Sequence, residues 1–422
     1  MKRISRVSIF ALLVIFSSLI SAATAQDTSG SNAESDAPSV QQTVTVDQIH
    51  QYGLVAIAEG ELKKAIALFR TVLSVAPGHL AARRALVGIL IKTGNYSAAE
   101  FHLHELLRTD PNPHSQFDYQ KSLEEIVKVE PLKFSGTFAV LPSTNVNNGT
   151  QNIYFDTDLG QFVIDESGRE TSGVGLNLGV GANYRWALGL GQTLKMASSL
   201  SGVWYEIEAL RHIDATVALS YQRETAKTLW SIGPYIRRSW YAPNSSRDTS
   251  DNTTRGIALS YTRQISPSDK ISIGASLEDQ LHLEKPYLSG PFLSGTLKLE
   301  HRLNPKTQYF ITFGAQRYKP EAAHMAYQGL NVTAGMTTIL RNSLVTGVTV
   351  GIGHRGYDAN FTSLLFPRED DYYSVELSAL NNNFELFGIV PRFSCTYKRN
   401  LSNVAFYDYQ TTDCKISMVQ NF

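Results

Sequence analysis

From residue 132 onward the sequence keeps a period of two residues, and this pattern constrains the fold more than any other. In the stretch 297–303, for example, Leu297 and Leu299 alternate with Lys298 and Glu300. Successive side chains of a strand point to opposite faces, so this alternation predicts strands with one apolar and one polar face. No stretch of this region approaches the ~18 consecutive apolar residues of a membrane helix. We therefore expect β-structure throughout residues 131–422.

Short turns and longer polar stretches divide these strands in regular alternation. Turn signals such as Gly189–Gly191 and Asn304–Lys306 recur about every 40 residues, and longer polar stretches such as 145–170 and 358–370 lie between them. Tight turns at one end and long loops at the other are typical of outer-membrane barrels. The count predicts an all-β transmembrane barrel of about 14 antiparallel strands. A soluble β-sandwich is the alternative, but it requires no such regular alternation.

The N-terminal segment predicts export from the cytoplasm. Lys2, Arg3 and Arg6 precede an apolar run, and the small-residue site Ala23–Ala25 follows it. This is the pattern of a cleaved signal peptide over residues 1–25, whereas a single membrane anchor would need a longer apolar run. Residues 26–43 are rich in Ser, Asp, Ala and Gln, which predicts a disordered tail.

Residues 44–130 contain an internal repeat of 34 residues. Four positions recur at this offset: Gly60 and Gly94, Ala65 and Ala99, Phe69 and Leu103, Pro77 and Pro111. The period and the residue types are those of tetratricopeptide repeats, so we predict a small all-α domain with a further capping helix at 114–129. An unrelated pair of helical hairpins is the alternative. Such repeats bind peptides on a concave face, where we place a possible client groove at Tyr52, Phe69 and Tyr96.

Composition and motifs exclude several functional classes. Lys and Arg number 38, as do Asp and Glu, so the net charge is zero and nothing indicates binding to nucleic acid. The sequence lacks nucleotide-binding, nucleophile-elbow and metal motifs, so we expect no enzyme activity, no cofactor and no metal site. His102 and His104 point to different faces of one helix. His212 and Asp214 share a strand face, but the sequence offers no catalytic third partner.

The strand faces that should point into the barrel carry charges of both signs. A polar conduit is one interpretation, and paired charges that fill a narrow interior are the other. The residues concerned are Asp214, Glu278, Lys298, Glu300, Glu376, Arg392 and Lys398.

The two cysteines, Cys395 and Cys414, lie in the last two predicted strands. Their midpoint falls in the loop 400–406, so a simple hairpin places them nearly opposite each other and on the same face. Because an exported protein meets oxidising conditions, a cross-strand disulfide is one interpretation. Two unbonded small apolar residues are the other, and neither cysteine lies in a CxxC motif.

Two motifs at the ends of the predicted barrel carry a family resemblance. One is the opening segment Leu141-Pro142-Ser143-Thr144-Asn145-Val146-Asn147, which follows Phe134-Ser135-Gly136, and the other is the closing run at 399–409. Together with the repeats in front of the barrel, they resemble the surface lipoprotein assembly modulator (Slam) family, the type XI secretion outer-membrane translocon, over about residues 45–422. The motif positions are Pro142, Asn145, Asn147, Ser402, Asn403, Tyr407 and Tyr409.

The resemblance implies a translocon that moves client proteins across the bacterial outer membrane. Its clients would be surface lipoproteins, or haem- or metal-acquisition proteins with a small barrel domain of their own. Phe422 resembles the signal read by the barrel assembly machinery. We expect a monomer in outer-membrane lipid, with the helical domain in the periplasm and a lateral seam where the last strand meets residues 132–141. The alternative is an exopolysaccharide export porin with a tetratricopeptide module.

Overall fold

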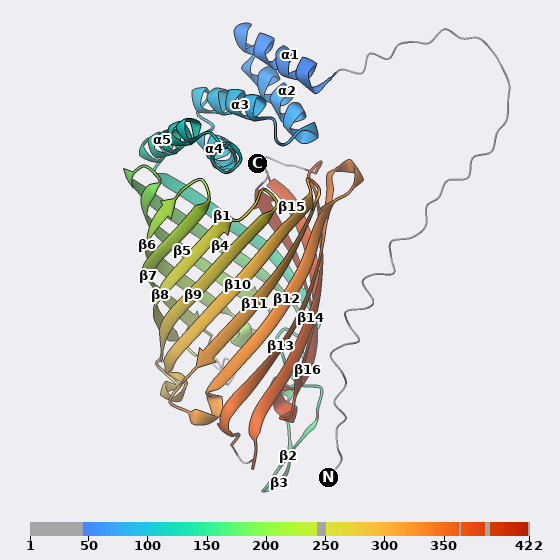
Figure 1. The fold of residues 1–422 in the computed structure, drawn as a ribbon. Coiled ribbons are helices and arrows are strands. Elements are labelled where there is room, and N and C mark those ends of the chain that lie inside the picture. Colours follow the sequence, from blue (N-terminus) through green and yellow to red (C-terminus); the bar gives the residue numbers. More distant parts are fainter. Residues whose placement is uncertain (1–44, 243–249, 363, 385–388, 421–422) are drawn as a thin grey trace, which may run out of the picture. The chain divides into compact units, whose positions relative to one another are not determined.

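The computed structural model describes residues 45–242, 250–362, 364–384 and 389–420 (Figure 1). The predicted signal peptide at 1–25, the predicted tail at 26–43 and Phe422 lie outside the described residues.

Five α-helices precede the barrel, as the repeat predicts. Thr45 and Gln48 form a capping box at the start of the first helix, which satisfies two backbone amides that the helix itself leaves unpaired. Gly60 and Gly94 follow the first and third helices at φ values of 78° and 73°, a conformation that glycine adopts without strain. The helices are α1 (Val46–Ala58), α2 (Leu62–Val75), α3 (Leu80–Lys92), α4 (Tyr96–Thr109) and α5 (Pro113–Val129).

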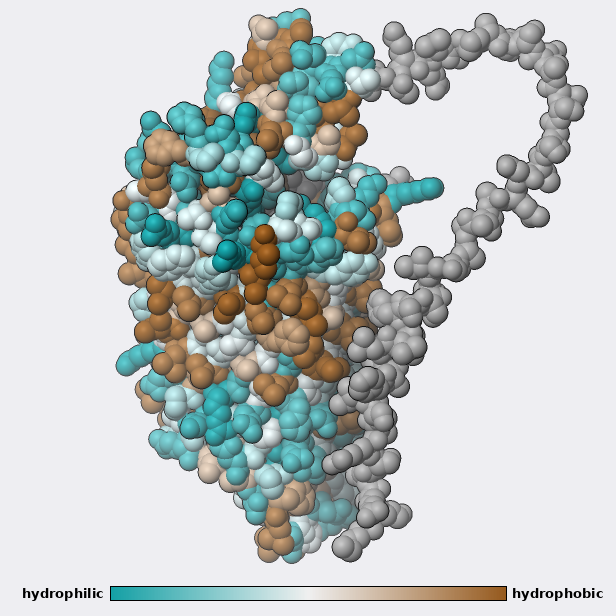
Figure 2. Space-filling view, viewed as in Figure 1, coloured by the Kyte–Doolittle hydropathy of each residue, from teal (hydrophilic) through white to brown (hydrophobic). Residues whose placement is uncertain are grey.

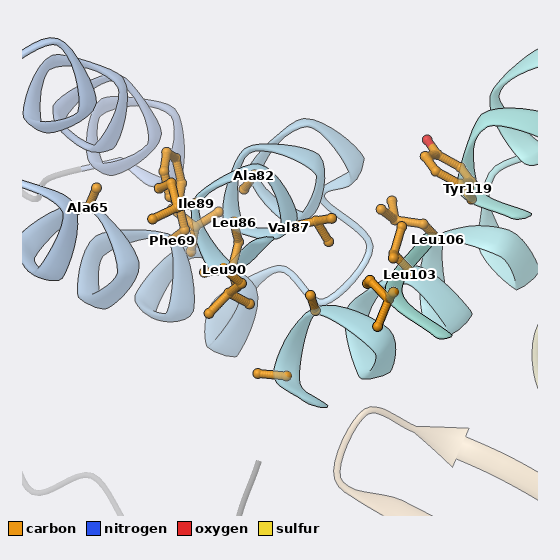
Figure 3. Close-up of a cluster of buried hydrophobic side chains, with 14 of the residues drawn as sticks. Ala65, Phe69, Ala82, Leu86, Val87, Ile89, Leu90, Leu103, Leu106 and Tyr119 are labelled. Atoms are coloured by element: carbon orange, nitrogen blue, oxygen red, sulfur yellow. The ribbon is translucent and has the colours of Figure 1, made fainter. Parts of the chain in front are cut away.

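Phe69 is part of the helical core (Figure 3). Its side chain is fully buried, and a Cβ atom at Gly53 would lie 2.7 Å from Cε1 of Phe69. The glycine of α1 therefore lets α2 approach closely enough for the ring to fill the space between the helices. Ala65 and Ala99 are also fully buried, as expected of the small residue that each repeat places at a helix crossing.

Fourteen antiparallel strands form a closed barrel, as predicted, and β2 (Tyr154–Thr157) and β3 (Gly160–Val163) form a separate hairpin within the first long loop. The barrel strands are β1 (Leu132–Ser143), β4 (Gly173–Gly189), β5 (Gln192–Tyr205), β6 (His212–Glu224), β7 (Thr228–Tyr241), β8 (Asn252–Gln264), β9 (Asp269–His282), β10 (Gly290–Asn304), β11 (Thr307–Tyr318), β12 (Tyr327–Ile339), β13 (Leu344–Asn360), β14 (Pro367–Asn381), β15 (Ile389–Ser402) and β16 (Tyr409–Gln420).

Short 3₁₀ helices occur in the connections between strands. They are η3 (Glu166–Gly168), η4 (Glu208–Leu210), η5 (Pro286–Leu288), η6 (Ala323–Met325), η7 (Arg341–Ser343) and η8 (Ala405–Tyr407). We call the end of the barrel that carries Leu132 the turn end, because tight connections such as that between β10 and β11 lie there. The opposite end, which carries Ser143, is the loop end.

The outer faces of the strands are apolar and the inner faces are polar. Figure 2 shows apolar residues gathered in a band across the strands on the face in view, and outward residues such as Val180, Val217 and Ile236 are 65%, 42% and 44% exposed. Inside the barrel, charges of opposite sign pair: Glu300 contacts Lys270 at 2.7 Å and Lys298 at 3.1 Å. Arg392 lies 3.6 Å from Glu376, and Lys398 lies 2.9 Å from Asp413. The described interior thus contains the paired charges that the second interpretation predicts.

Replacing Phe69 with alanine tests the role of the ring in the helical core. Loss of a fully buried aromatic side chain typically costs about 3–5 kcal/mol, so the F69A variant should lose helical circular dichroism at a markedly lower temperature while the barrel stays folded. Phe117 of α5, which is 49% exposed, provides the matched control. Equal melting of F69A and F117A would contradict this account of the core.

His102 should make the helical region sensitive to acid. Burial, followed by the nearby charges of Arg83 and Arg70, lowers the pKa of His102 to about 4, and Nη1 of Arg83 donates to its Nδ1 at 3.1 Å. The His102 side chain is protonated near pH 6.5 in the unfolded chain and near pH 4 in the folded chain. Its contribution to the free energy of unfolding is therefore fully present above pH 6.5 and is lost as the pH falls from 6.5 to about 4. The helical melting temperature should therefore drop between pH 7 and pH 4.5, and H102Q should reduce the drop. If the melting temperature of H102Q fell with pH as much as that of the wild type, His102 would not be the cause of the acid sensitivity.

Candidate functional site: the seam between β1 and β16

The barrel closes where β1 meets β16, and this seam has the shortest register of any pair of neighbouring strands. On its other side, β1 is in register with β4 at every residue from Leu132 to Ser143. Likewise, β16 follows β15 from Tyr409 to Gln420. Within the described residues, the pairs in register across the seam are Ala139–Ser417, Val140–Ile416 and Ser143–Asp413.

Pro142 interrupts the seam. By the register of the pairs around it, Pro142 lies opposite Cys414 of β16. Proline has no backbone N–H to donate, and strands that are paired on both sides rarely contain it. The proline of the opening motif therefore weakens backbone pairing at the point where the barrel must close.

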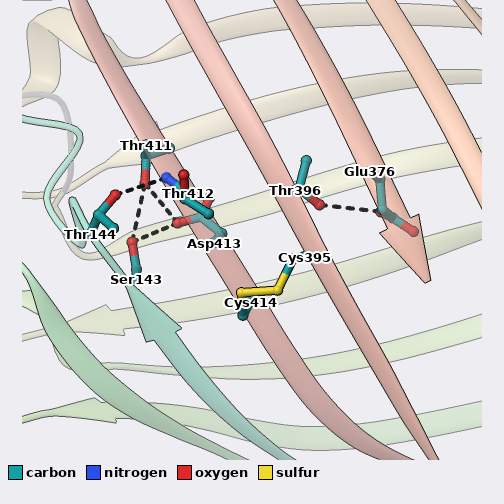
Figure 4. Close-up of a disulfide and its surroundings, with 9 residues drawn as sticks. All are labelled: Ser143, Thr144, Glu376, Cys395, Thr396, Thr411, Thr412, Asp413 and Cys414. Atoms are coloured by element: carbon teal, nitrogen blue, oxygen red, sulfur yellow. Dashed lines mark hydrogen bonds between the residues drawn. A yellow bond between two sulfur atoms is a disulfide. The ribbon is translucent and has the colours of Figure 1, made fainter. Parts of the chain in front are cut away.

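Side-chain and backbone hydrogen bonds together join the two strands at the loop end (Figure 4). Oγ of Ser143 donates to Oδ1 of Asp413 at 2.6 Å, and Oγ1 of Thr411 donates to the same oxygen at 2.9 Å. The backbone N–H of Thr412 donates to Oγ1 of Thr144 at 2.9 Å, and that of Thr144 donates to the Thr412 carbonyl at 3.1 Å. We call this network the clasp, and define it as Ser143, Thr144, Asn145, Thr411, Thr412 and Asp413.

Asn145 connects the clasp to the first long loop. It is 2% exposed, and its Nδ2 donates to the carbonyl oxygens of Gly149 and Gln410, each at 2.8 Å. Its Oδ1 accepts the Gly149 N–H at 2.9 Å. A Cβ atom at Gly149 would lie 2.3 Å from the Arg169 carbonyl, so the turn requires glycine. Asn145 thus fixes the loop and holds β16 at the same time.

Asn147 holds the far side of the same loop. Its Nδ2 donates to the Arg169 carbonyl at 2.7 Å, and its Oδ1 accepts the Thr171 N–H at 3.1 Å. The two asparagines of the opening motif therefore shape one compact loop from both sides.

The closing motif fixes the last loop in a similar way. Nδ2 of Asn403 donates to the Pro367 carbonyl at 2.9 Å, and its Oδ1 accepts the Glu369 N–H at 2.8 Å. Oγ of Ser402 accepts the Val404 N–H at 3.2 Å. Tyr409 pairs with Asn400 as the first residue of β16. These contacts bind the loop to β14 on one side and lead directly into β16 on the other.

The structure brings the opening and closing motifs together. Oγ1 of Thr150 and Nδ2 of Asn152, both in the first loop, donate to the Ala405 carbonyl in the last loop at 2.7 and 3.1 Å. Three loops at this end also contribute to one apolar cluster, in which Val404 is fully buried. The cluster contains Phe155, Phe361, Leu364, Val404, Phe406 and Tyr407.

Arg368 is a buried charged residue inside the barrel, near its loop end. It is 6% exposed, donates to both oxygens of Asp370 at 2.9 and 2.7 Å, and lies 3.3 Å over the Tyr407 ring and 4.6 Å from the Tyr357 ring. It borders an internal cavity of about 690 Å³ that Arg237 and Arg355 also line. Tyr407 of the closing motif therefore packs into the interior and stabilises a buried ion pair.

Cys395 and Cys414 form a disulfide between β15 and β16, with an Sγ–Sγ distance of 1.98 Å. The two cysteines are direct cross-strand partners. The pair Phe393 and Ile416 lies two residues away and is 50% and 39% exposed on the outer face, so the disulfide lies on the same outer face. The bond holds β16 against β15 beside the weak seam.

Of the three residues predicted for a client groove, one lies inside the helical core. Tyr52 is 56% exposed, but Phe69 is fully buried and Tyr96 packs against the helical core. Phe69 therefore cannot line a client groove, because the repeat uses this position to pack one helix on another. An unpredicted contact links the helices to the barrel: Glu100 of α4 contacts Arg185 of β4 at 2.6 Å and also pairs with Lys133 of β1.

The histidines form no catalytic or metal-binding arrangement in the part of the chain that the structure describes. His102 contacts Arg83, whereas His104 contacts Glu224 at 2.9 Å. Nε2 of His212 lies 3.8 Å from Asp214, whose Oδ1 accepts from Ser239 at 2.5 Å. Among the described residues there is no group of three or more His, Cys, Asp or Glu side chains placed to hold a metal ion. None of the described helices is long and apolar enough to cross a membrane.

Comparison with protein families gives two matches. The family model described as "Surface lipoprotein assembly modifier" matches residues 132–422, and a tetratricopeptide repeat model matches residues 56–121. The first match covers the whole barrel, including both motifs and every residue of the clasp. It includes none of the helical region.

Curated relatives carry the same description. Surface lipoprotein assembly modifier 1 of Haemophilus influenzae (strain ATCC 51907 / DSM 11121 / KW20 / Rd) is 22% identical over 373 residues, which cover 86% of this chain and 75% of the relative. Surface lipoprotein assembly modifier 2 of the same strain is 25% identical over 284 residues, or 64% of this chain and 55% of the relative.

Solved structures resemble the barrel only distantly. A bacterial polysaccharide outer membrane secretin aligns with a TM-score of 0.39 and 11% identity, over 68% of this chain and 98% of its own. The Pseudomonas putida toluene transporter TodX aligns with a TM-score of 0.37 and 8% identity, over 68% of this chain and 89% of its own. Neither likeness supports an argument about function.

The N145A variant tests the clasp. It leaves the buried carbonyl of Gly149 and the Gly149 N–H without their side-chain partner, which typically costs about 1–3 kcal/mol for each unsatisfied group. We expect the folded barrel to convert to the unfolded form at a lower temperature in a heat-modifiability gel. Q161A, in the exposed β2–β3 hairpin, is the control. Identical transitions for the two variants would show that Asn145 does not hold the seam.

Proposed function

Because the chain belongs to the surface lipoprotein assembly modifier family, we propose that it is an outer-membrane translocon that moves client proteins from the periplasm to the cell surface. The clients would be surface lipoproteins, as the family description suggests, or secreted proteins that acquire haem or metals. The family match over residues 132–422 supports a role for the barrel itself.

One observation carries the proposal: the two family motifs converge on the seam where the barrel closes. Asn145 of the opening motif bonds to Gln410 beside the closing motif, and Pro142 removes a backbone donor from the same seam. A passive pore gains nothing from a weakened closure, since a continuous ladder satisfies all backbone groups in the membrane. A seam that side chains close reversibly suits a barrel that must open for a large polypeptide.

The interior also favours a polypeptide route over a steady open pore. Ion pairs such as Lys270–Glu300 link side chains on the inner face of the barrel. Arg368 and Asp370 are buried near the loop end. Moving a client past these groups requires the loops or the seam to rearrange. The translocon should therefore conduct ions poorly in the absence of a client.

We place the loop end at the cell surface and the turn end in the periplasm, where α1–α5 would meet the client before the barrel does. Longer loops on the outside and tight turns on the inside are the rule for outer-membrane barrels. The barrel assembly machinery would insert the monomeric protein by reading its last strand and Phe422. No enzymatic step and no cofactor is part of the proposal.

Deletion of the gene tests the proposed function directly. Surface digestion with a protease and quantitative proteomics should show that one or a few proteins lose most of their surface exposure, while their total amounts stay the same. Complementation with the wild-type gene should restore exposure.

An unchanged set of surface proteins would contradict the proposal. A large, steady conductance of the purified protein in planar bilayers, together with loss of surface polysaccharide in the deletion strain, would favour the polysaccharide porin instead. Expression of N145A with Q161A as the control links the phenotype to the clasp.

A further inference from the structure

The internal cavity of about 690 Å³ near the loop end has walls of different chemistry. Among the described residues that line it, three are arginines, Arg237, Arg355 and Arg368, and one, Asp214, is acidic. Asp214 belongs to β6, which is seven strands from β13 in the closed order of fourteen, so it lies on the wall opposite Arg355. The wall formed by β12, β13 and β14 thus presents arginine and tyrosine side chains to the cavity.

Tyrosine rings hold the two arginines of this wall in place. The guanidinium carbon of Arg355 lies 4.6 Å from the ring centre of Tyr327, and that of Arg368 lies 4.6 Å from the ring centre of Tyr357. The two rings are themselves 5.4 Å apart. A guanidinium group that stacks on a ring keeps the N–H groups at its edge available to donate. Two positive charges are therefore fixed on neighbouring rings, and a bound anion would offset their mutual repulsion.

The two arginines differ in their partners. Arg368 donates to both carboxylate oxygens of Asp370 at 2.9 and 2.7 Å, so its charge is balanced. The described contacts of Arg355 are with tyrosines, among them the rings of Tyr327 and Tyr372. Within the described part of the chain its Nε is buried without a hydrogen-bond partner. Burial of a charged group is costly unless the group is paired and hydrogen-bonded. An anion in the cavity would supply the charge partner that Arg368 has in Asp370.

The opposite side of the cavity supplies further polar groups. Nη2 of Arg237 on β7 donates to Oγ1 of Thr254 at 3.4 Å and lies 3.8 Å from Glu278. Hydroxyl and amide side chains of β7, β8 and β9 line the same side, and such groups can bond to the hydroxyl groups of a ligand. They are Ser239, Asn252, Thr254 and Gln280. The volume lies in the range of about 300–1,000 Å³ that is usual for small-molecule sites.

Arginine suits phosphate and carboxylate groups because its planar edge can donate two parallel hydrogen bonds to them. We propose that the cavity binds a small polar molecule that carries a phosphate or a carboxylate group. This group lies against Arg355, and the rest of the molecule extends toward Arg237 and the polar side chains of β7–β9. The inference uses no property of a client, so it is independent of the proposed function.

Isothermal titration calorimetry with the purified full chain in detergent and phosphate-free buffer tests the proposal. The probes are glucose 6-phosphate, which carries a phosphate group, glucuronate, which carries a carboxylate, and glucose, which has a similar size but no charge. The wild type should bind at least one of the two anions at least about tenfold more tightly than glucose. The anion that binds more tightly identifies the group that the site recognises. Saturation with it should also raise the transition temperature in the heat-modifiability gel, because a ligand of the folded state stabilises that state.

Substitution of Arg355 locates the site. R355Q removes the guanidinium charge and should weaken binding of the anion at least about tenfold. R317Q is the matched control, because Arg317 of β11 donates to Asp358 at 2.7 Å and does not border the cavity. It should bind the anion as the wild type does. R237Q, on the opposite wall, should also weaken binding, and it provides a second variant if R355Q does not fold in the heat-modifiability gel.

Three results would overturn the proposal. They are failure of the wild type to bind either anion more tightly than glucose, equal binding of the anion to R355Q and to the wild type, and an equal loss of binding in R355Q and R317Q. The last result would show that the anion responds to the overall charge of the protein and not to the cavity. The measurement uses neither cells nor clients, so an unchanged set of surface proteins in the deletion strain would count against the proposed function alone.

Discussion

Backbone hydrogen bonding is the constraint on which the rest of this structure depends. A strand in a bilayer must pair on both sides, because lipid supplies neither donors nor acceptors. Thirteen of the strand-to-strand joints meet this requirement through long ladders between neighbours in sequence or, for β1 and β4, across a single loop. The remaining joint connects the two ends of the barrel, and it has the fewest residues in register among the described strands.

That joint divides into two parts with different chemistry. Toward the loop end, Ser143, Thr411 and Asp413 replace part of the backbone ladder with side-chain hydrogen bonds, and Asn145 ties them to the loop around Gly149. Toward the turn end, the pairs across the seam among the described residues stop at Ala139 and Ser417, while β16 is described as far as Gln420. Side-chain bonds can be exchanged one at a time, whereas a ladder opens cooperatively. At the loop end, the closed seam of the structure therefore depends on side-chain bonds as well as on backbone pairs.

The sequence predicted those features that depend on local pattern. Alternation such as that at Leu297–Leu303 specifies a strand because its two faces meet different solvents, and the 34-residue repeat specifies helices because Gly60 and Gly94 end them. Features that depend on closure of the whole barrel could not be predicted from the local sequence pattern, because they involve residues far apart in the chain. Ser143 and Thr411 look like ordinary inward residues of a strand until β16 is placed beside β1.

Two further differences have the same origin. Phe69 was placed in a client groove because such repeats bind peptides on a concave face, but its role follows from the close approach of α1 at Gly53. The stretch 145–170 read as one polar loop, yet it contains the β2–β3 hairpin and the turn fixed by Asn145 and Asn147. The motif residues Asn145, Asn147 and Asn403 were found from the sequence, although the resemblance alone did not reveal that their amide groups hold backbone segments from different loops together.

Amide hydrogen exchange of the full chain in lipid nanodiscs tests the central claim most directly, because it reports which half of the seam is closed. The account predicts slow exchange at Ala139, Val140 and Ser143 of β1 and at their partners on β16. It predicts faster exchange at those amides of residues 136–138 that face the seam, and protection of the neighbouring β4 amides that face β5. Protection at residues 136–138 equal to that at Ala139 and Val140 would show that the seam is paired beyond Ala139, and would contradict the account.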